Sequence, residues 1–280
     1  MFEFRTLKDT SVSLLIKCFN EAFSDYSLPV NLSEEQFCAF LKADRVDLAL
    51  SFGAFFKGEP IGFMLNYSGI YHNEKIVFDA GTGIIPAFRG QGVFSRLLAA
   101  AEGEILKNGI RKYCLEVLQD NDRAIKIYQG QGFAITRRFL VLKSYEELNV
   151  LPDPSVRFTD VISFGTDRLE KCGLLNASYE HSMWIIREGD ENYSVAYIEK
   201  GDAITACCVY SRHRCYVMQL GYTDIDDLRK LIVCLVSQCG NILIKNLDED
   251  YVEVSDMLKA TVFKVVAKQY EMTKELSFDR

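Results

Sequence analysis

Residues 84–94 read Ile84-Ile85-Pro86-Ala87-Phe88-Arg89-Gly90-Gln91-Gly92-Val93-Phe94, and this stretch decides the fold. Before it, residues 76–80 are rich in the β-branched and aromatic residues that favour strands. After it, apolar side chains fall on one stripe of a helix, at Phe94, Leu97, Leu98, Ala101 and Ile105. We therefore expect a strand-to-helix loop whose last glycine, Gly92, opens the helix.

Such a loop is suited to hold an anion. A helix begins with four backbone N–H groups that have no partner within the helix, and the peptide dipoles add partial positive charge there. Gly90 and Gly92 have no Cβ, so an anion can approach these amides closely, and Arg89 adds a charge beside them. The spacing is neither that of a nucleotide P-loop nor the three-glycine dinucleotide fingerprint. We interpret residues 89–94 as a pyrophosphate cradle; loops of this kind that bind nothing are the alternative.

Two motifs in the correct order resemble those of the GNAT N-acetyltransferase superfamily. Arg89-x-x-Gly92-x-Phe94 resembles its acyl-CoA-binding motif Q/R-x-x-G-x-G/A, with Phe94 in place of the final small residue. Asn121-x-x-Ala124-x-x-x-Tyr128-x-x-x-Gly132-Phe133 matches the other signature without a mismatch. The resemblance covers roughly residues 1–145 and implies the α/β fold of the acyl-CoA N-acyltransferases, with its mixed sheet.

The resemblance also implies acetyl-CoA as the co-substrate. The residues that would bind it are Ile84, Ile85, Arg89, Gly90, Gln91, Gly92, Val93, Phe94, Asn121 and Ala124. In this fold the strand before the cradle splays from its parallel neighbour, here residues 113–118, and the pantetheine arm enters the wedge between them. Two helices near the N-terminus cover the acceptor site in the family. Phe23, Asp25, Tyr26 and Phe37 are therefore candidate substrate neighbours, with ordinary core and loop positions as the alternative.

Three side chains are candidates for the proton transfers of acyl transfer. Tyr128 matches the tyrosine that the family uses as the acid for the departing thiolate; otherwise its ring simply packs under its helix. Glu116 is the only carboxylate in an apolar strand, where a raised pKa would suit a general base. Its surroundings, Leu115-Glu116-Val117, are similar to those of the proposed base in ribosomal-protein alanine acetyltransferases. A structural ion pair for Glu116, Asp79 as a rival base, and proton loss through water remain alternatives.

Composition narrows the class of protein. The chain has 280 residues, a net charge of −7 and 49% hydrophobic residues, as expected for a globular protein that binds neither nucleic acid nor an anionic membrane. No run of apolar residues is long enough to span a membrane, and the first residues do not resemble a signal peptide. Nine cysteines without CxxC spacing and three scattered histidines indicate no metal site and a cytoplasmic location.

The chain divides near its middle. Pro152 and Pro154 lie in a linker, so we expect a GNAT acetyltransferase domain at residues 1–147 and a second domain at 148–280. The second half repeats the order of elements of the first, beginning with a helix-like stretch at 167–177. Its counterpart of the cradle, residues 221–224, carries Asp224 where an anion would sit. We expect a degenerate GNAT-like domain without a CoA site, which completes the acceptor pocket or an interface.

The leading hypothesis is therefore an N-acetyltransferase that transfers an acetyl group from acetyl-CoA to a primary amine of a small molecule or peptide. A non-catalytic acyl-CoA-binding or sensory module is the runner-up, and a purely structural partner protein is the third. The sequence leaves the acceptor, the length of the acyl group and the oligomeric state open.

Overall fold

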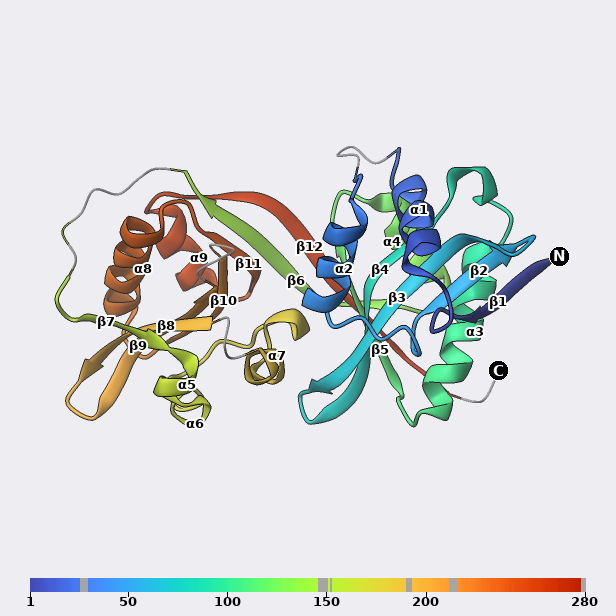
Figure 1. Ribbon diagram of the computed structural model, residues 1–280. Helices are drawn as coiled ribbons and strands as arrows, with labels where there is room; N and C mark the ends of the chain where they lie inside the picture. The colour runs from blue at the N-terminus through green and yellow to red at the C-terminus, as the bar shows by residue number, and fades with distance from the viewer. Residues whose placement is uncertain (26–29, 146–150, 152, 190–192, 212–215, 278–280) are drawn as a thin grey trace. The chain divides into compact units, whose positions relative to one another are not determined.

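The computed structural model describes residues 1–25, 30–145, 151, 153–189, 193–211 and 216–277 (Figure 1). They form two compact units. The first unit comprises Met1–Glu116, Lys126–Ala134 and Met272–Arg280, and the second comprises Val117–Ile125 and Ile135–Glu271. The domain boundary expected at residue 147 lies outside the described residues and stays a prediction.

The first unit is built on a mixed sheet with the strand order β1-β2-β3-β4-β5. The strands are β1 Phe2–Thr6, β2 Phe52–Phe56, β3 Glu59–Tyr71, β4 Glu74–Ile84 and β5 Lys112–Leu118. Neighbours from β1 to β4 are antiparallel, whereas β4 and β5 are parallel. This arrangement confirms the expected α/β fold class with a mixed sheet.

Helices pack on both faces of this sheet. They are α1 Val12–Ala22, α2 Glu34–Ala43, the short 3-10 helix η1 Pro86–Phe88, α3 Val93–Lys107 and α4 Asp122–Gly130. The helix α2 begins with the capping box that its sequence predicts, because Gln36 N–H donates to the Ser33 hydroxyl and Ser33 N–H donates to the Gln36 side chain. On the α1 face, Phe19 stacks on Phe63 with ring centroids 5.3 Å apart. On the opposite face, Tyr113 meets Phe133 edge to face at 5.6 Å.

Two glycines shape β4. The register with β3 shifts between Asp79 and Gly81, which is the irregularity that glycines in a strand often mark. A Cβ on Gly83 would lie 2.8 Å from the Phe63 ring and 2.9 Å from Ala22 of α1. Gly83 therefore allows α1 to approach the sheet closely. The bulge changes the direction of the side chains near Asp79.

The strands of the second unit follow the order β6-β11-β10-β9-β8-β7. Its strands are β6 Ala134–Ser144, β7 Val156–Asp160, β8 Tyr193–Lys200, β9 Ala203–Ser211, β10 Tyr216–Tyr222 and β11 Leu243–Asp248. A last strand, β12 Phe263–Glu275, contributes residues to both units. The helices are α5 Val161–Phe164, α6 Thr166–Leu169, η2 Tyr179–His181, α7 Met183–Glu188, α8 Ile225–Cys239 and α9 Val252–Lys259.

The helix α8 buries an apolar stripe, with Leu228, Leu231, Ile232 and Leu235 all in the core of the second unit. The helix expected over 167–177 is wrong beyond Leu169. Gly173 has a left-handed φ of 61°, and its C=O accepts a hydrogen bond from Tyr222 N–H in β10. Pairing with a distant strand thus overrides the local helical pattern.

Candidate functional site

The cradle has the conformation that its glycines predict. Gly90 and Gly92 have φ values of 74° and 70°, in the left-handed region that favours glycine. A Cβ added to either residue would meet no atom within 4 Å, so the space above both is open. Among the described residues no side chain caps the N-terminus of α3, and its first turn carries no acidic residue. The amides that open α3 are therefore accessible to an anion.

Arg89 is arranged differently from the free charge that the sequence suggests. Its Nε donates to the Ile84 carbonyl at 2.9 Å, and its Nη2 donates to the Ala22 carbonyl at 2.7 Å. Both Nη atoms also bind the Asp25 carboxylate, at 2.5 and 3.0 Å. Arg89 therefore ties the start of the cradle to the end of α1, with its charge balanced by Asp25.

The strands β4 and β5 stop pairing with each other before they end, and we call the region between their unpaired ends the fork. The parallel register of β4 and β5 runs from the pair Ile76–Lys112 to the pair Asp79–Leu115. Both strands continue past this last pair, β4 to Ile84 and β5 to Leu118. Ile85 N–H is bound to the Ile61 carbonyl at 3.0 Å, so its amide is engaged with β3. The part of β4 that follows Asp79 is thus the edge that faces the fork.

Asp79 and Tyr128 meet on one face of the sheet. The Asp79 carboxylate accepts hydrogen bonds from Gly81 N–H at 2.9 Å, from the Thr82 hydroxyl at 2.6 Å, and from the Tyr128 hydroxyl. Asp79 is only 8% exposed. Burial raises its pKa to about 6, although these three hydrogen bonds favour the charged form. The Tyr128 ring lies between Phe94 of α3 and Phe133, with both centroids 5.7 Å away.

Glu116 lies on the other face of the sheet. Side chains alternate along a strand, so Glu116 shares a face with Cys114 and not with Leu115, the register partner of Asp79. Cys114 pairs with Phe78, whose ring contacts Tyr67 at 5.2 Å on the α1 face. Glu116 itself is half-buried, with one carboxylate oxygen inaccessible to solvent. The structure therefore brings Tyr128 and Asp79 together and separates Glu116 from them by the thickness of the sheet.

Asn121 and Ala124 form the N-terminus of α4. The Asn121 side chain accepts a hydrogen bond from Ala124 N–H at 3.1 Å, and its C=O accepts from Ile125 N–H. Asn121 thus has the helix-capping role that its position predicts. Both residues belong to the second unit, and their roles toward CoA stay predictions.

The remaining acceptor-site candidates have mixed positions. Phe23 and Phe37 each contact Phe19, at 4.9 and 5.1 Å between ring centroids; Phe37 is buried in the core, whereas Phe23 is half-buried. Asp25 binds Arg89, and Tyr26 lies outside the described residues. The hydrogen bond from Thr82 to Asp79 was not predicted from the sequence. Thr82 lies three residues after Asp79, but this spacing indicates a contact only when the bulge in β4 is known.

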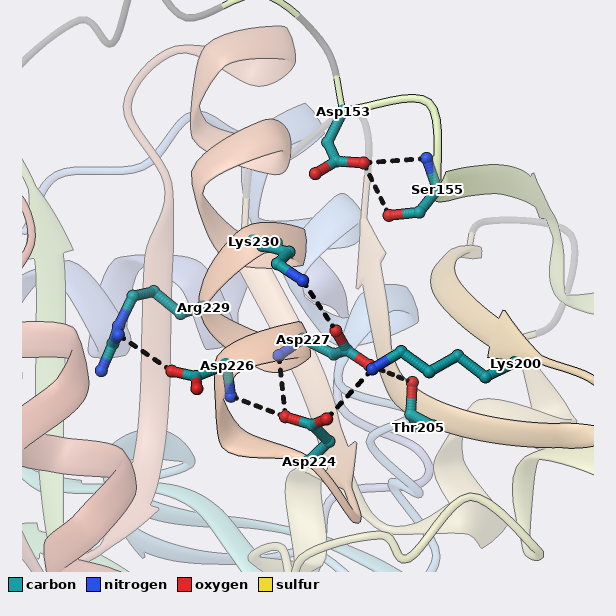
Figure 2. A network of polar contacts seen from close by, with 9 residues as sticks. All are labelled: Asp153, Ser155, Lys200, Thr205, Asp224, Asp226, Asp227, Arg229 and Lys230. Atoms are coloured by element: carbon teal, nitrogen blue, oxygen red, sulfur yellow. Dashed lines mark hydrogen bonds and ion pairs between the residues drawn. The ribbon is translucent and has the colours of Figure 1, made fainter.

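The second unit has its own charged network at the start of α8 (Figure 2). The Asp224 carboxylate accepts hydrogen bonds from the amides of Asp226 and Asp227, at 3.0 and 3.3 Å. The Asp227 side chain is 1% exposed and binds Lys200 at 2.5 Å and Lys230 at 3.1 Å. Burial disfavours the Asp227 carboxylate, but bonds from Lys200, Thr205 and Lys230 outweigh it and lower its pKa to about 2. Two amides that would open an anion site are occupied by the chain itself.

In the second unit, the corresponding region between β10 and β11 is occupied by the chain itself. Among the described residues, the parallel strands β10 and β11 pair at Tyr216–Leu243 and Val217–Ile244. Beyond these pairs, Leu175 N–H donates to the Leu220 carbonyl at 2.8 Å, and Leu174 forms a bridge with Gly221. A small cavity of about 30 Å³ remains there, with Gln219 and Asn246 among its lining residues. A strand-like segment of the chain therefore takes the hydrogen-bonding edge of β10.

Metal-binding clusters and membrane-spanning helices are both absent from the part of the chain that the structure describes. No group of three or more His, Cys, Asp or Glu side chains among these residues is arranged to hold a metal ion. No helix in the same ranges is long and apolar enough to cross a membrane.

Comparison with known proteins places these features. Residues 11–133 match the model of the Acetyltransferase (GNAT) family. The chain is 30% identical over 80 residues to the uncharacterized N-acetyltransferase YdgE of Bacillus subtilis, which is 29% of this chain and 51% of YdgE. It is 29% identical over 101 residues to an aminoglycoside N(6')-acetyltransferase type 1 of Salmonella typhimurium, covering 34% of this chain and 70% of that protein. The match thus spans about half the length of YdgE.

Solved structures extend the likeness of fold to the whole chain. A GCN5-related N-acetyltransferase from Sphaerobacter thermophilus has a TM-score of 0.71 at 12% identity, over 98% of this chain and 96% of that one. A tandem GNAT protein from the clavulanic acid biosynthesis pathway has a TM-score of 0.66 at 12% identity, over 100% of both chains. Residues 11–133 thus match the GNAT acetyltransferase family, and the chain as a whole shares its fold with a tandem GNAT protein.

Proposed function

We propose that the chain is an acetyl-CoA-dependent N-acetyltransferase that acetylates a primary amine of a small molecule or peptide. The observation that carries this proposal is the fork between β4 and β5, which opens after Asp79 and Leu115 beside an uncapped helix N-terminus. The fork can take an extended pantetheine arm along the edge of β4 that faces it, and the helix N-terminus can take the diphosphate of the same molecule.

The cradle residues have separate roles in this proposal. The amides from Gly90 to Phe94 bind the diphosphate, and the absence of a Cβ on Gly90 and Gly92 lets it approach. Arg89 holds the cradle to α1 through Ala22 and Asp25.

The two faces of the sheet separate the two proton transfers. Glu116, on the α1 face, takes a proton from the acceptor ammonium group, and one of its oxygens is already buried. Tyr128, on the opposite face, gives a proton to the leaving sulfur. A thioester lying in the fork has access to both faces, so each residue can act without competing for the same space. Orientation of this kind can contribute about 7–11 kcal/mol to lowering the barrier.

We propose further that the second half is a GNAT-like domain that binds no CoA. Its α8 amides are bound by Asp224, and the edge of β10 is bound by Leu174 and Leu175. A diphosphate at this position would meet the carboxylates of Asp224 and Asp226 instead of free amides. One coenzyme per chain, measured by isothermal titration calorimetry, is the expected stoichiometry; two would contradict it.

The acceptor is proposed to be cationic. The chain carries a net charge of −7, which attracts amines that are protonated at neutral pH. One of the similar proteins is an aminoglycoside acetyltransferase. A first panel of acceptors therefore contains aminoglycosides, polyamines and peptides with a free N-terminus.

Substitution tests the proposal. Tyr128→Phe and Glu116→Gln are expected to lower thiol release from acetyl-CoA with the best amine by about 10²–10⁴-fold, because each removes one proton transfer. Their affinity for CoA, measured by calorimetry, should stay within about twofold of wild type. Glu104→Gln, at a partly exposed position of α3, is the matched control and should leave both quantities unchanged.

Two outcomes would contradict the assignment. Full activity of both variants would show that neither side chain transfers a proton in the reaction. If the wild-type chain binds CoA but no amine of the panel gives thiol release, the chain is a binding module and not an enzyme.

A further inference from the structure

Asp79 has an environment that does not suit a base for the acceptor amine. It lies on the face covered by α4, paired with Leu115 in the last rung before the fork. All three of its identified donors come from this side: Gly81 and Thr82 of β4, and Tyr128 of α4. Glu116 lies on the opposite face, toward α1.

We infer that Asp79, in its protonated form, is a positioning residue for Tyr128 that leaves the Tyr128 hydroxyl proton directed toward the leaving sulfur, and is not the base that deprotonates the amine. The inference rests on the proposed function and assigns a separate role to a carboxylate that the sequence leaves as a rival to Glu116. Because Asp79 acts through Tyr128, its effect should vanish when the Tyr128 hydroxyl is absent.

Whether Tyr128 or Asp79 donates the hydrogen bond between them decides whether the Tyr128 proton can reach the sulfur. When Asp79 is ionised, the single proton of the Tyr128 hydroxyl points to the carboxylate and is not available to the sulfur. When Asp79 is protonated, its carboxyl group donates to the Tyr128 oxygen, and the phenol proton is free to face the sulfur. Burial raises the pKa of Asp79 to about 6, so the protonated form is present in roughly a tenth of the molecules at pH 7.

The groups around Asp79 favour this switch. Neutral side chains face it from the neighbouring elements, namely Thr82 on β4, Asn66 on β3, Tyr113 on β5 and Tyr128 on α4. The Tyr113 hydroxyl donates to the Asn66 side chain at 2.6 Å. The charge of Glu102 on α3 contributes to raising the pKa of Tyr113, and Glu102 forms an ion pair with Lys274. No cation among these groups contacts Asp79, so nothing in this set holds it in its charged form.

Protons and electron pairs balance in the transfer step. The amine nitrogen forms a bond to the thioester carbonyl carbon, and the C–S bond breaks with its electron pair going to sulfur. Tyr128 gives its proton to the sulfur, and the resulting phenolate takes the proton of the Asp79 carboxyl group. The acceptor ammonium group first loses one proton to Glu116, which passes it to solvent, and after the attack Glu116 takes the second proton from nitrogen and releases it to solvent as well. Exchange with solvent returns a proton to Asp79 before the next turnover.

An NMR titration tests the hydrogen bond between Asp79 and Tyr128 in the absence of an acceptor amine. The ¹³C resonance of the Asp79 carboxyl group, assigned by its loss in Asp79→Asn, should titrate near pH 6 in the wild-type chain. Tyr128→Phe removes one donor to the carboxylate, so the midpoint should move to higher pH. Tyr113→Phe, which removes a buried phenol that binds Asn66 instead, is the matched control and should move it much less. An unchanged midpoint in Tyr128→Phe would overturn the inference.

Kinetics distinguish positioning from base catalysis. Asp79→Ala should lower kcat for thiol release by about 10²-fold with little change in KM for acetyl-CoA, whereas Asp79→Asn, whose amide can still donate to Tyr128, should retain most of the activity. In a Tyr128→Phe background, Asp79→Ala should cause no further loss. Equal loss in the Asn and Ala variants, with effects that multiply with Tyr128→Phe, would identify Asp79 as a base and overturn the inference.

The failures of the two proposals are separable. A wild-type chain that binds CoA and releases no thiol overturns the proposed function. If the wild-type chain is active but the titration midpoint of Asp79 is the same in Tyr128→Phe as in wild type, only the positioning role of Asp79 is overturned.

Discussion

Arg89→Lys is the substitution that best separates a structural role from a simple charge. In the structure the guanidinium group donates to the carbonyls of Ile84 and Ala22 and twice to the Asp25 carboxylate. A lysine keeps the positive charge but lacks the planar fork that reaches several acceptors at once. If Arg89 serves only to attract phosphate, the lysine variant should behave almost like wild type.

The size of the effect follows from the contacts. Each lost hydrogen bond from a charged donor to a carbonyl costs about 1.5 kcal/mol, and lysine can replace at most one of the two to Ile84 and Ala22. Asp25 is 50% exposed, so its ion pair adds less than about 1 kcal/mol. We expect the free energy of unfolding to fall by about 2 kcal/mol in Arg89→Lys.

Urea unfolding followed by circular dichroism measures this change, with equal m-values in both proteins as the check on a shared mechanism. Asp25→Asn is the companion variant, and it should lower stability by less than about 1 kcal/mol and weaken CoA binding slightly. An Arg89→Lys variant as stable as wild type would refute the structural role of Arg89. Tighter CoA binding by Asp25→Asn would refute it too, because Arg89 would then act as a phosphate ligand that Asp25 holds back.

Two other predictions follow from single sites. Asp227→Asn should lower the free energy of unfolding at pH 7 by about 1–2 kcal/mol, because it removes the charge that Lys200 and Lys230 bind. The pKa of Asp227 is lowered to about 2, so this contribution is complete above about pH 4 and is lost as the pH falls toward 2; urea titrations across that range should show the two proteins converging. Gly92→Ala should cost about 1 kcal/mol, because the φ of 70° is unfavourable for alanine, and it should weaken CoA binding measured by calorimetry through the Cβ placed in the open space of the cradle. Loss of stability in Gly92→Ala without loss of CoA affinity would show that the coenzyme does not approach this amide.

Features with a local cause were predictable from the sequence. The capping box at Ser33, the helix that Gly92 opens and the buried stripe of α8 each depend on residues within a few positions of one another. The alternation along β5 that puts Glu116 and Leu115 on opposite faces is also local.

Contacts between distant residues were not predictable. Arg89 and Asp25 are joined by an ion pair that depends on how α1 packs against the end of β4. The contact of Tyr128 with Asp79 depends on a bulge and on the placement of α4. The segment at 173–175 has the pattern of a helix, but the hydrogen bonds it makes with β10 are worth more than its local preference.

The proposed roles of the cradle and of the two proton-transfer residues all depend on where coenzyme A binds, and a crystal structure of the chain grown with CoA tests this most directly. We predict that the diphosphate lies against the amides of residues 90–94, with the sulfur in the fork between β4 and β5, within reach of Tyr128 on one face and Glu116 on the other. A diphosphate bound elsewhere, with this helix N-terminus empty, would contradict these roles.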